Sequence, residues 1–473
     1  MNAVDVCVIG GGPAGSASAI RLVQLGHRVV LVERAPRGRA HVGESLPPSV
    51  LPLLDALGVR DSVEAAGFLR PRDAQVQWDG ALRDASMHAG HAGAPGFQVD
   101  RGRFDALLLD AAAAVGVTLI QPVAAGAPQR DGPRMRVALR DGREVRAQWV
   151  VDARGRRGVA GPAPRTAALY AYWPGAGGED ARTRVESGVD AWYWGAPLPD
   201  GSFNATVFVD AARCAGLDRG ARHALYRALL ARSALLRPVL GGAVPADVRV
   251  CDATAGLASD PAADGVLRVG EAAFTIDPLS SQGVQAALRN GLQAAVCVHT
   301  LLARPGDAEL ALAFHADQVR RTAQHHARLA AGFHAAAAQQ FGSAFWLARA
   351  GVALPWRAPA APPAPAGLDV RVTVDPRASW EREPILDGEW IVEADAIDHP
   401  ALEAPVAFIG GVPVRALLRP LASSVTLHEL LRRWALEFGE PRAGALFATL
   451  WRQGLIVPAA SPPLRARADA PPG

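Results

Sequence analysis

Lysine is absent from the 473 residues of this sequence, so every side-chain cation other than histidine is an arginine. Because arginine does not give up its proton near neutral pH, mechanisms that need a lysine nucleophile or a lysine proton donor are excluded. Cysteine is scarce, with four residues and no CxxC pair or other metal-ligand spacing. We therefore expect no metal site and no disulfide framework, and scattered thiols of this kind are typical of the cytoplasm.

Long apolar runs and long basic runs are missing as well. Without them we expect neither a membrane span nor a nucleic-acid partner, and the formal net charge of +3 is spread along the chain. A strand already begins near residue 4, which leaves no room for a signal peptide. Half of the residues are hydrophobic, and this length predicts two or three domains.

The first motif is a glycine-rich turn after residues 4–10, "VDVCVIG", which have the composition of a buried parallel strand. Gly10, Gly12 and Gly15 follow in G-x-G-x-x-G spacing, then a helical stretch, then a strand that ends at Glu33. In this arrangement the glycines permit a tight turn and a close approach to a pyrophosphate, and the acid contacts a ribose. The sequence therefore predicts a dinucleotide site, and the Glu33-Arg34 pair favours FAD over NADP.

A second segment, residues 265–291, reads as strand, loop and helix. It contains Gly270-Glu271, then Asp277-Pro278, then Gln282-Gly283 before an alanine-rich helix. A helix that begins there points its partial positive charge at the preceding loop, where it stabilises the negative edge of a reduced flavin.

These motifs together resemble FAD-dependent aromatic hydroxylases. The resemblance also rests on residues 100–105, "DRGRFD", and on "VVDARG" at 150–155. Gly43-Glu44-Ser45 resembles the flavin-dependent halogenase branch and its monooxygenase relatives, and "WYWGAP" at 192–197 is similar to the W-x-W-x-I-P signature of halogenases. Within this superfamily, "GESLPP" and "DPLSSQG" look most like the monooxygenases that mature tryptophylquinone cofactors.

The resemblance implies FAD as cofactor, with O2 as co-substrate and with NADH, NADPH or a partner reductase as electron source. Glu271 departs from the aspartate that is usual in the family, so its contact is expected to shift. The cofactor residues that it implies are Gly10, Gly12, Pro13, Ala14, Gly15, Glu33, Arg34, Gly43, Glu44, Ser45, Arg101, Asp152, Gly270, Glu271, Asp277, Pro278, Gln282, Gly283 and Val284.

Hydroxylation is the favoured reaction, because halogenases of this family use a lysine that this chain lacks. The resemblance then implies oxygen transfer from a flavin C4a-hydroperoxide to an electron-rich ring, such as tryptophan in a peptide or protein. Candidate substrate-side residues are Ser45, Trp192, Trp194 and His91, the last in a glycine-rich loop with His88. A halogenase, an isoprenoid-type flavin reductase and a non-catalytic flavoprotein that acts as a binding module are the alternatives.

The fold expected is α/β: a discontinuous Rossmann-like FAD-binding domain (1–70, 100–160, 245–340) with an inserted antiparallel β-sheet substrate domain (71–99, 161–244). Four histidines between 306 and 350 are expected on a solvated helix face. A helix end and Pro/Ala linker (341–367) leads to a winged-helix-like α+β domain (368–458) and a disordered tail (459–473). That last domain is expected to dock a peptide or protein substrate, or to serve in dimerisation or stabilisation; DNA binding is disfavoured because its recognition helix carries only Arg452.

Overall fold

The computed structural model describes residues 4–39, 41–71, 73–86, 95–156, 159, 161, 164–176, 182–263, 265–351 and 363–459. They form two compact units. The first unit is Met1–Pro355 with Leu386–Ile391, and the second unit is Trp356–Ile385 with Val392–Gly473. The predictions for His88, His91, the centre of the Pro/Ala linker and the tail beyond residue 459 fall outside the described residues. In the described ranges, no helix is both long and apolar enough to cross a membrane.

An eight-stranded sheet carries the first glycine motif. Its parallel strands lie in the order β18-β10-β1-β2-β7, and β17, β9 and β8 extend it in antiparallel fashion. The bounds are β1 (Val4–Ile9), β2 (Val29–Val32), β7 (Thr118–Ile120), β8 (Gln129–Asp131), β9 (Arg134–Ala138), β10 (Glu144–Asp152), β17 (Ala262–Ala263) and β18 (Val266–Arg268).

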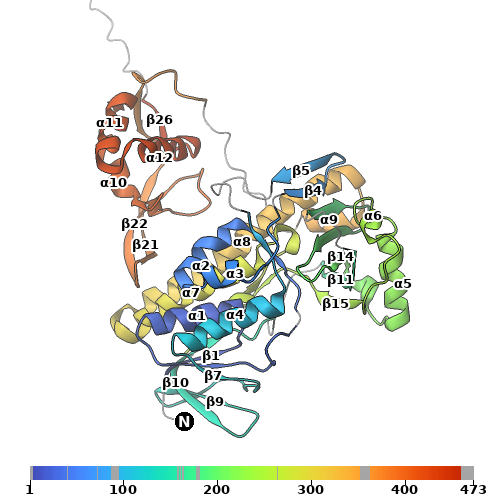
Figure 1. The fold of residues 1–473 in the computed structure, drawn as a ribbon. Coiled ribbons are helices and arrows are strands. Elements are labelled where there is room, and N and C mark those ends of the chain that lie inside the picture. The colour runs from blue at the N-terminus through green and yellow to red at the C-terminus, as the bar shows by residue number, and fades with distance from the viewer. Residues whose placement is uncertain are drawn as a thin grey trace, which may run out of the picture. The chain divides into compact units, whose positions relative to one another are not determined.

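Both faces of this sheet are buried, which explains the unbroken apolar sequence of β1. Val6 and Val8 belong to one core cluster, and Cys7 and Ile9 belong to another on the opposite face. Figure 1 shows three helices together on the first face: α1 (Pro13–Gln24), α4 (Arg101–Ala114) and α7 (Gly283–Ala303). The sequence thus predicted the strand-helix-strand unit of β1, α1 and β2 correctly.

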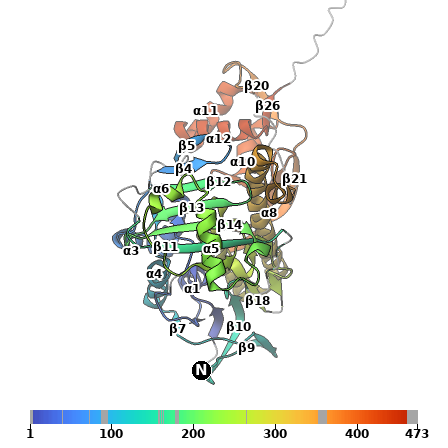
Figure 2. The same cartoon turned by 90° about the vertical axis from the view of Figure 1, so that its right-hand side faces the viewer.

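A seven-stranded sheet forms the other layer of the first unit, and its central strands are stacked in Figure 2. The order is β15-β11-β14-β13-β12-β4-β5, and every pair is antiparallel except β12 with β4. The turn "PDGS" at 199–202 joins β13 to β14. The bounds are β4 (Asp73–Gln77), β5 (Leu82–Ser86), β11 (Thr166–Trp173), β12 (Thr183–Ser187), β13 (Trp192–Pro197), β14 (Phe203–Asp210) and β15 (Arg249–Asp252).

Strand β15 corrects one expected boundary. We expected the FAD-binding domain to resume at about residue 245, but β15 pairs with β11 and extends the seven-stranded sheet. The shorter elements of the unit are β3 (Ser45–Leu46), α2 (Leu51–Leu57), α3 (Arg60–Ala65), β6 (Phe97–Gln98), α5 (Arg219–Leu230), α6 (Leu236–Leu240), β16 (Gly256–Leu257), η3 (Gly270–Ala272), β19 (Phe274–Thr275) and η4 (Pro278–Ser280).

The helical region after residue 306 divides at Gly342 into α8 (Ala308–Phe341) and α9 (Ala344–Ala350). Our expectation that its histidines lie on a solvated face was wrong for three of them. His315 is 0% exposed, His326 8% and His334 5%, because α8 packs against α7 and the short strands β16 and β19. Of the four histidines between residues 306 and 350, His325 alone is exposed.

The second unit has its own hydrophobic core. Its three-stranded antiparallel sheet has the order β25-β20-β26. The Thr426 side chain accepts a hydrogen bond from the Glu429 N–H, an arrangement for which a threonine three residues before a glutamate is a local signal. The winged-helix-like fold of this unit stays a prediction. The bounds are β20 (Arg371–Val374), β21 (Ser379–Asp387), β22 (Trp390–Asp398), β23 (Phe408–Ile409), β24 (Val412–Pro413), α10 (Val414–Leu418), β25 (Val425–Thr426), α11 (Leu427–Phe438), α12 (Glu440–Arg452) and β26 (Ile456–Pro458).

Candidate functional site

The turn between β1 and α1 leaves open space at one glycine and none at the other two. A Cβ on Gly10 would lie 2.3 Å from the Ala153 carbonyl oxygen, and a Cβ on Gly15 would lie 1.9 Å from the Gly10 oxygen. Gly10 also has a φ of +109°. At Gly12, by contrast, a Cβ would meet nothing within 4 Å. The turn therefore closes tightly on itself and keeps free the position at which backbone approaches a pyrophosphate.

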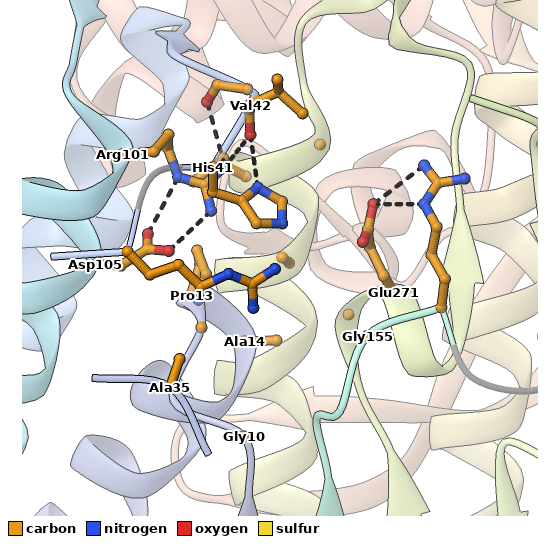
Figure 3. Close-up of a pocket in the computed structure, with 18 of the residues that line it drawn as sticks. Gly10, Pro13, Ala14, Ala35, His41, Val42, Arg101, Asp105, Gly155 and Glu271 are labelled. Carbon is orange, nitrogen blue, oxygen red and sulfur yellow. Dashed lines mark hydrogen bonds and ion pairs between the residues drawn. The ribbon is translucent and has the colours of Figure 1, made fainter. Parts of the chain in front are cut away.

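A cleft of about 1040 Å³ opens at this turn, between the two sheets of the first unit. In Figure 3, Arg101 and Glu271 lie on opposite sides of it, with Pro13 and Ala14 at the start of α1 between them. The predicted cofactor residues that line the cleft are Gly10, Gly12, Pro13, Ala14, Gly15, Glu33, Arg34, Gly43, Glu44, Ser45, Arg101, Gly270, Glu271, Pro278, Gly283 and Val284.

Three predicted cofactor residues are not among the lining residues, because each is engaged elsewhere. The Asp152 carboxylate is held by the Arg154 guanidinium at 2.7 and 2.8 Å. Asp277 accepts a hydrogen bond from the Leu279 N–H at 3.0 Å and so caps η4. Gln282 lines a separate, much smaller cavity beside α7.

Glu33 and Arg101 shape the cleft through the backbone. Glu33 accepts hydrogen bonds from the N–H groups of Gly11 and Ala35, both at 2.6 Å, so its carboxylate fixes the loop that follows β2. Arg101 pairs with both oxygens of Asp105 at 3.1 Å and donates to the Val42 carbonyl at 2.9 Å. Arg101 therefore holds the loop before Gly43 in place.

Glu44 connects this loop to the seven-stranded sheet. Its side chain is buried, and one carboxylate oxygen accepts hydrogen bonds from the Tyr172 hydroxyl and the Asn204 amide, each at 2.9 Å. The other oxygen accepts from the Gly43 N–H at 2.9 Å. Burial and the neighbouring Glu44 charge both raise the pKa of Tyr172, so its hydroxyl stays protonated as a donor.

Ser45 belongs to a second buried link. Its hydroxyl donates to the Gln98 side-chain oxygen at 2.9 Å, and the Gln98 amide donates to the Thr183 hydroxyl at 2.9 Å. The Gly43-Glu44-Ser45 triplet is thus fixed to β11, β14 and β12, and one wall of the cleft is rigidly positioned against the other.

The far wall of the cleft is one face of the seven-stranded sheet. Alternate residues of β11 and β14 point away from the cleft into a core covered by α5 and α6, and the residues between them face the cleft. The residues of the sheet that line the cleft are Ala168, Tyr170, Trp194, Asn204, Thr206, Phe208, Arg249, Cys251 and Asp252, and Ala253 follows just past the end of β15. Apart from Trp194 these residues were missed, although the alternation in "TAALYAYW" and "NATVFVD" is a signal that identifies those on β11 and β14.

The two tryptophans of "WYWGAP" have different surroundings. Trp194 lines the cleft, and its indole N–H is buried without a hydrogen-bond partner among the described residues. Trp192 is 1% exposed and stacks on Phe208 with ring centroids 3.6 Å apart. We expected both on the substrate side; Trp192 is instead absent from the lining of the cleft, because its cross-strand partner Phe208 lines the cleft and covers the Trp192 ring.

Glu271 and the start of α7 form the remaining side. The Glu271 carboxylate lies 3.2 Å from the Arg156 guanidinium, so the longer side chain reaches an arginine of the chain itself. Gly270 has a φ of +57°, and its N–H donates to the Asn290 side chain at 2.9 Å. The N-termini of α1 and α7 both face the cleft through Gly15 and Gly283, which suits a pyrophosphate at one and an anionic flavin edge at the other.

These residues fit FAD. The open Gly12, the two helix N-termini and the length of the cleft provide for a dinucleotide with an extended ring system. Within the described residues, no group of three histidine, cysteine or acidic side chains is arranged to hold a metal ion.

Comparison with known proteins agrees with this cofactor. A family model described as FAD binding domain matches residues 3–166. The chain is 29% identical over 345 residues to the tryptophan 2-halogenase of Chondromyces crocatus, a match that covers 66% of this chain and 64% of that protein, less than two thirds of its length. It is 28% identical over 357 residues to the flavin-dependent halogenase armH3 of Armillaria mellea, covering 67% and 71%.

Two solved structures are similar over nearly the whole chain. CmlS, a flavin-dependent halogenase, has a TM-score of 0.80 and 22% identity, with 96% of each chain covered; it supports the fold. The peptidyl tryptophan dihydroxylase QhpG, essential for tryptophylquinone cofactor biogenesis, has a TM-score of 0.71 and 29% identity, covering 96% of this chain and 100% of that one. The chain is therefore similar to flavin-dependent halogenases and related FAD monooxygenases, and its residues 3–166 match the FAD binding domain family.

Proposed function

We propose that the protein is an FAD-dependent monooxygenase that hydroxylates an electron-rich aromatic ring. The observation that carries the proposal is the combination of a flavin-sized cleft, an aromatic wall at Trp194 and Phe208, and a chain without lysine. Reduced FAD, when bound, would supply the two electrons that activate O2, of which one atom goes to the ring and the other leaves as water. NADH, NADPH or a partner reductase is the proposed electron source.

The residues of the chain contribute positioning and water exclusion. Glu44 and Ser45 hold the loop of the Gly43-Glu44-Ser45 triplet in place through Tyr172, Asn204 and Gln98. Trp194 and Phe208 offer apolar surface on which an aromatic substrate packs. Oxygen transfer to an electron-rich ring depends on this alignment and on the exclusion of water more than on a strong acid or base.

The proposed substrate is tryptophan within a peptide or protein. The support is the similarity to QhpG, a peptidyl tryptophan dihydroxylase, over 96% of this chain. Docking of such a peptide on the second unit is part of the proposal. We place the reaction in the cytoplasm, because all four cysteines are unpaired thiols.

Halogenation is the second candidate, favoured by "WYWGAP" on β13 and by the curated halogenases that match the chain. One experiment separates the two functions. Holoenzyme, a flavin reductase system and a tryptophan-containing peptide are incubated in air with and without chloride or bromide, and the peptide is analysed by mass spectrometry.

A hydroxylase adds one or two oxygen atoms, which carry the isotope when the gas is ¹⁸O₂, and the yield does not depend on halide. A halide-dependent product with the isotope pattern of chlorine or bromine would instead establish the halogenase. If neither product forms and reduced holoprotein leaves oxygen unconsumed, the non-catalytic alternative gains and the proposal is wrong.

A further inference from the structure

The arginines that line the cleft fall into two classes. Arg37, Arg101, Arg154 and Arg156 each pair with a carboxylate, from Asp110, Asp105, Asp152 and Glu271 respectively. Within the described part of the chain, Arg34, Arg39, Arg140 and Arg249 also line the cleft but have no acidic partner. The first three lie after β2 or between β9 and β10, in the nucleotide half. Arg249 is the member of this set that lies on the seven-stranded sheet.

The register of the sheet places Arg249 in a row with the aromatic wall. Arg249 pairs with Tyr170, Tyr170 with Thr206, and Thr206 with Trp194. All four side chains face the cleft, so the row runs from a cation through two hydroxyl groups to an indole. Its ends are three strand spacings apart, about 14 Å between Cα atoms, and the two long side chains shorten the gap that a ligand has to bridge.

The neighbours of Arg249 leave its charge available. Glu44 is the buried acid of this wall, but its oxygens already accept from Tyr172, Asn204 and Gly43. Burial raises the pKa of Tyr170, and the Arg249 guanidinium opposes that rise, so Tyr170 stays a neutral donor beside the cation. A planar guanidinium with a neighbouring hydroxyl is suited to bind a carboxylate through two hydrogen bonds.

We propose that Arg249, with Tyr170, binds a carboxylate of the substrate while the aromatic ring of the same molecule packs against Trp194 and Phe208. The inference rests on the proposed function, because it assigns the specificity of the same cleft. The substrate class is an aromatic compound with a carboxylate near the ring, either a free aromatic acid or a peptide with an acidic residue beside its tryptophan.

The test measures binding rather than turnover. Oxidised holoprotein is titrated with indole-3-propionate and with its neutral amide, and then with the peptides Ac-Trp-Glu-NH₂ and Ac-Trp-Gln-NH₂, while the flavin spectrum reports occupancy. The acidic member of at least one pair should bind about 10-fold more tightly, and the pair that shows the preference identifies the source of the carboxylate. In Arg249→Gln that preference should disappear, while the neutral probes bind within about twofold of wild type.

Arg227→Gln is the matched control, because Arg227 is an exposed arginine on α5, on the opposite face of the same sheet. It should keep the full preference. Equal affinity for acid and amide in the wild type would overturn the proposal, and so would loss of flavin from Arg249→Gln alone, which would assign the cation to the cofactor. A protein that prefers acids but never consumes oxygen would contradict the proposed function and still support this inference.

Discussion

The first glycine turn allows two neighbouring substitutions to be compared directly. In Gly12→Ala the added methyl group meets no atom of the chain within 4 Å. The free energy of unfolding of the apoprotein should change by less than about 1 kcal/mol, because alanine caps α1 less well than Gly12 but also restricts the unfolded chain more. The methyl group does occupy the space that a pyrophosphate needs, and the loss of one close phosphate contact lowers FAD affinity by about 10-fold or more.

Gly15→Ala should behave differently. Its Cβ would lie 1.9 Å from the Gly10 oxygen and 3.0 Å from the Ala153 Cβ, so the turn and α1 have to move apart. Overpacking of this kind costs about 1–3 kcal/mol, which corresponds to a Tm lower by about 2–4 °C for each kcal/mol. This variant should lose both stability and flavin.

The assay is thermal unfolding of the two apoproteins by circular dichroism. It is followed by titration with FAD, in which the visible absorption band of the flavin reports binding. Gly12→Ala with wild-type FAD affinity would refute the placement of the pyrophosphate at this turn. Equal Tm values for the two apoprotein variants would refute the steric argument.

Two further predictions concern buried groups. Glu44→Gln replaces an acceptor of three hydrogen bonds with a side chain that brings its own N–H donors. The free energy of unfolding measured in urea should therefore be lower by about 1–3 kcal/mol. An unchanged value would mean that the loop does not depend on this link. Burial lowers the pKa of His315 to about 4, against about 6.5 in the unfolded chain. The free energy of unfolding is therefore unaffected by this histidine above about pH 6.5 and decreases as the pH falls toward 4, by about 3 kcal/mol in total. Stability measured across that range should fall less steeply in His315→Gln.

Most of the fold could be predicted from local sequence patterns. The strand, turn and helix around Gly10, Gly12 and Gly15 follow from residues close in sequence, and so do the capping box at Thr426 and the turn between β13 and β14. Strand β15 was missed because its pairing with β11 joins residues far apart in the chain. The buried histidines of α8 were missed for the same reason, since a helix sequence does not reveal what packs on its second face.

The candidate site was likewise predictable where its features depend on local sequence and not where they depend on contacts distant in sequence. The backbone elements of the nucleotide half were predictable because Gly10 and Gly15 have steric reasons at their own positions and Gly12 keeps space open for a ligand. The contacts of Glu44 were not, since Tyr172 and Asn204 are 128 and 160 residues away. Period-two alternation correctly placed Trp192 and Trp194 on one face, but only the register against Phe208 decides which of them reaches the cleft.

The strict alternation of the seven-stranded sheet separates two properties that usually change together. Every second position along β11 and β14 contributes to the core beneath α5 and α6, and most of the central positions between them line the cleft. Evolution, or a focused library restricted to cleft-facing positions other than Asn204, which anchors Glu44, can therefore alter which molecules are accepted while the core on the opposite face of the sheet stays unchanged.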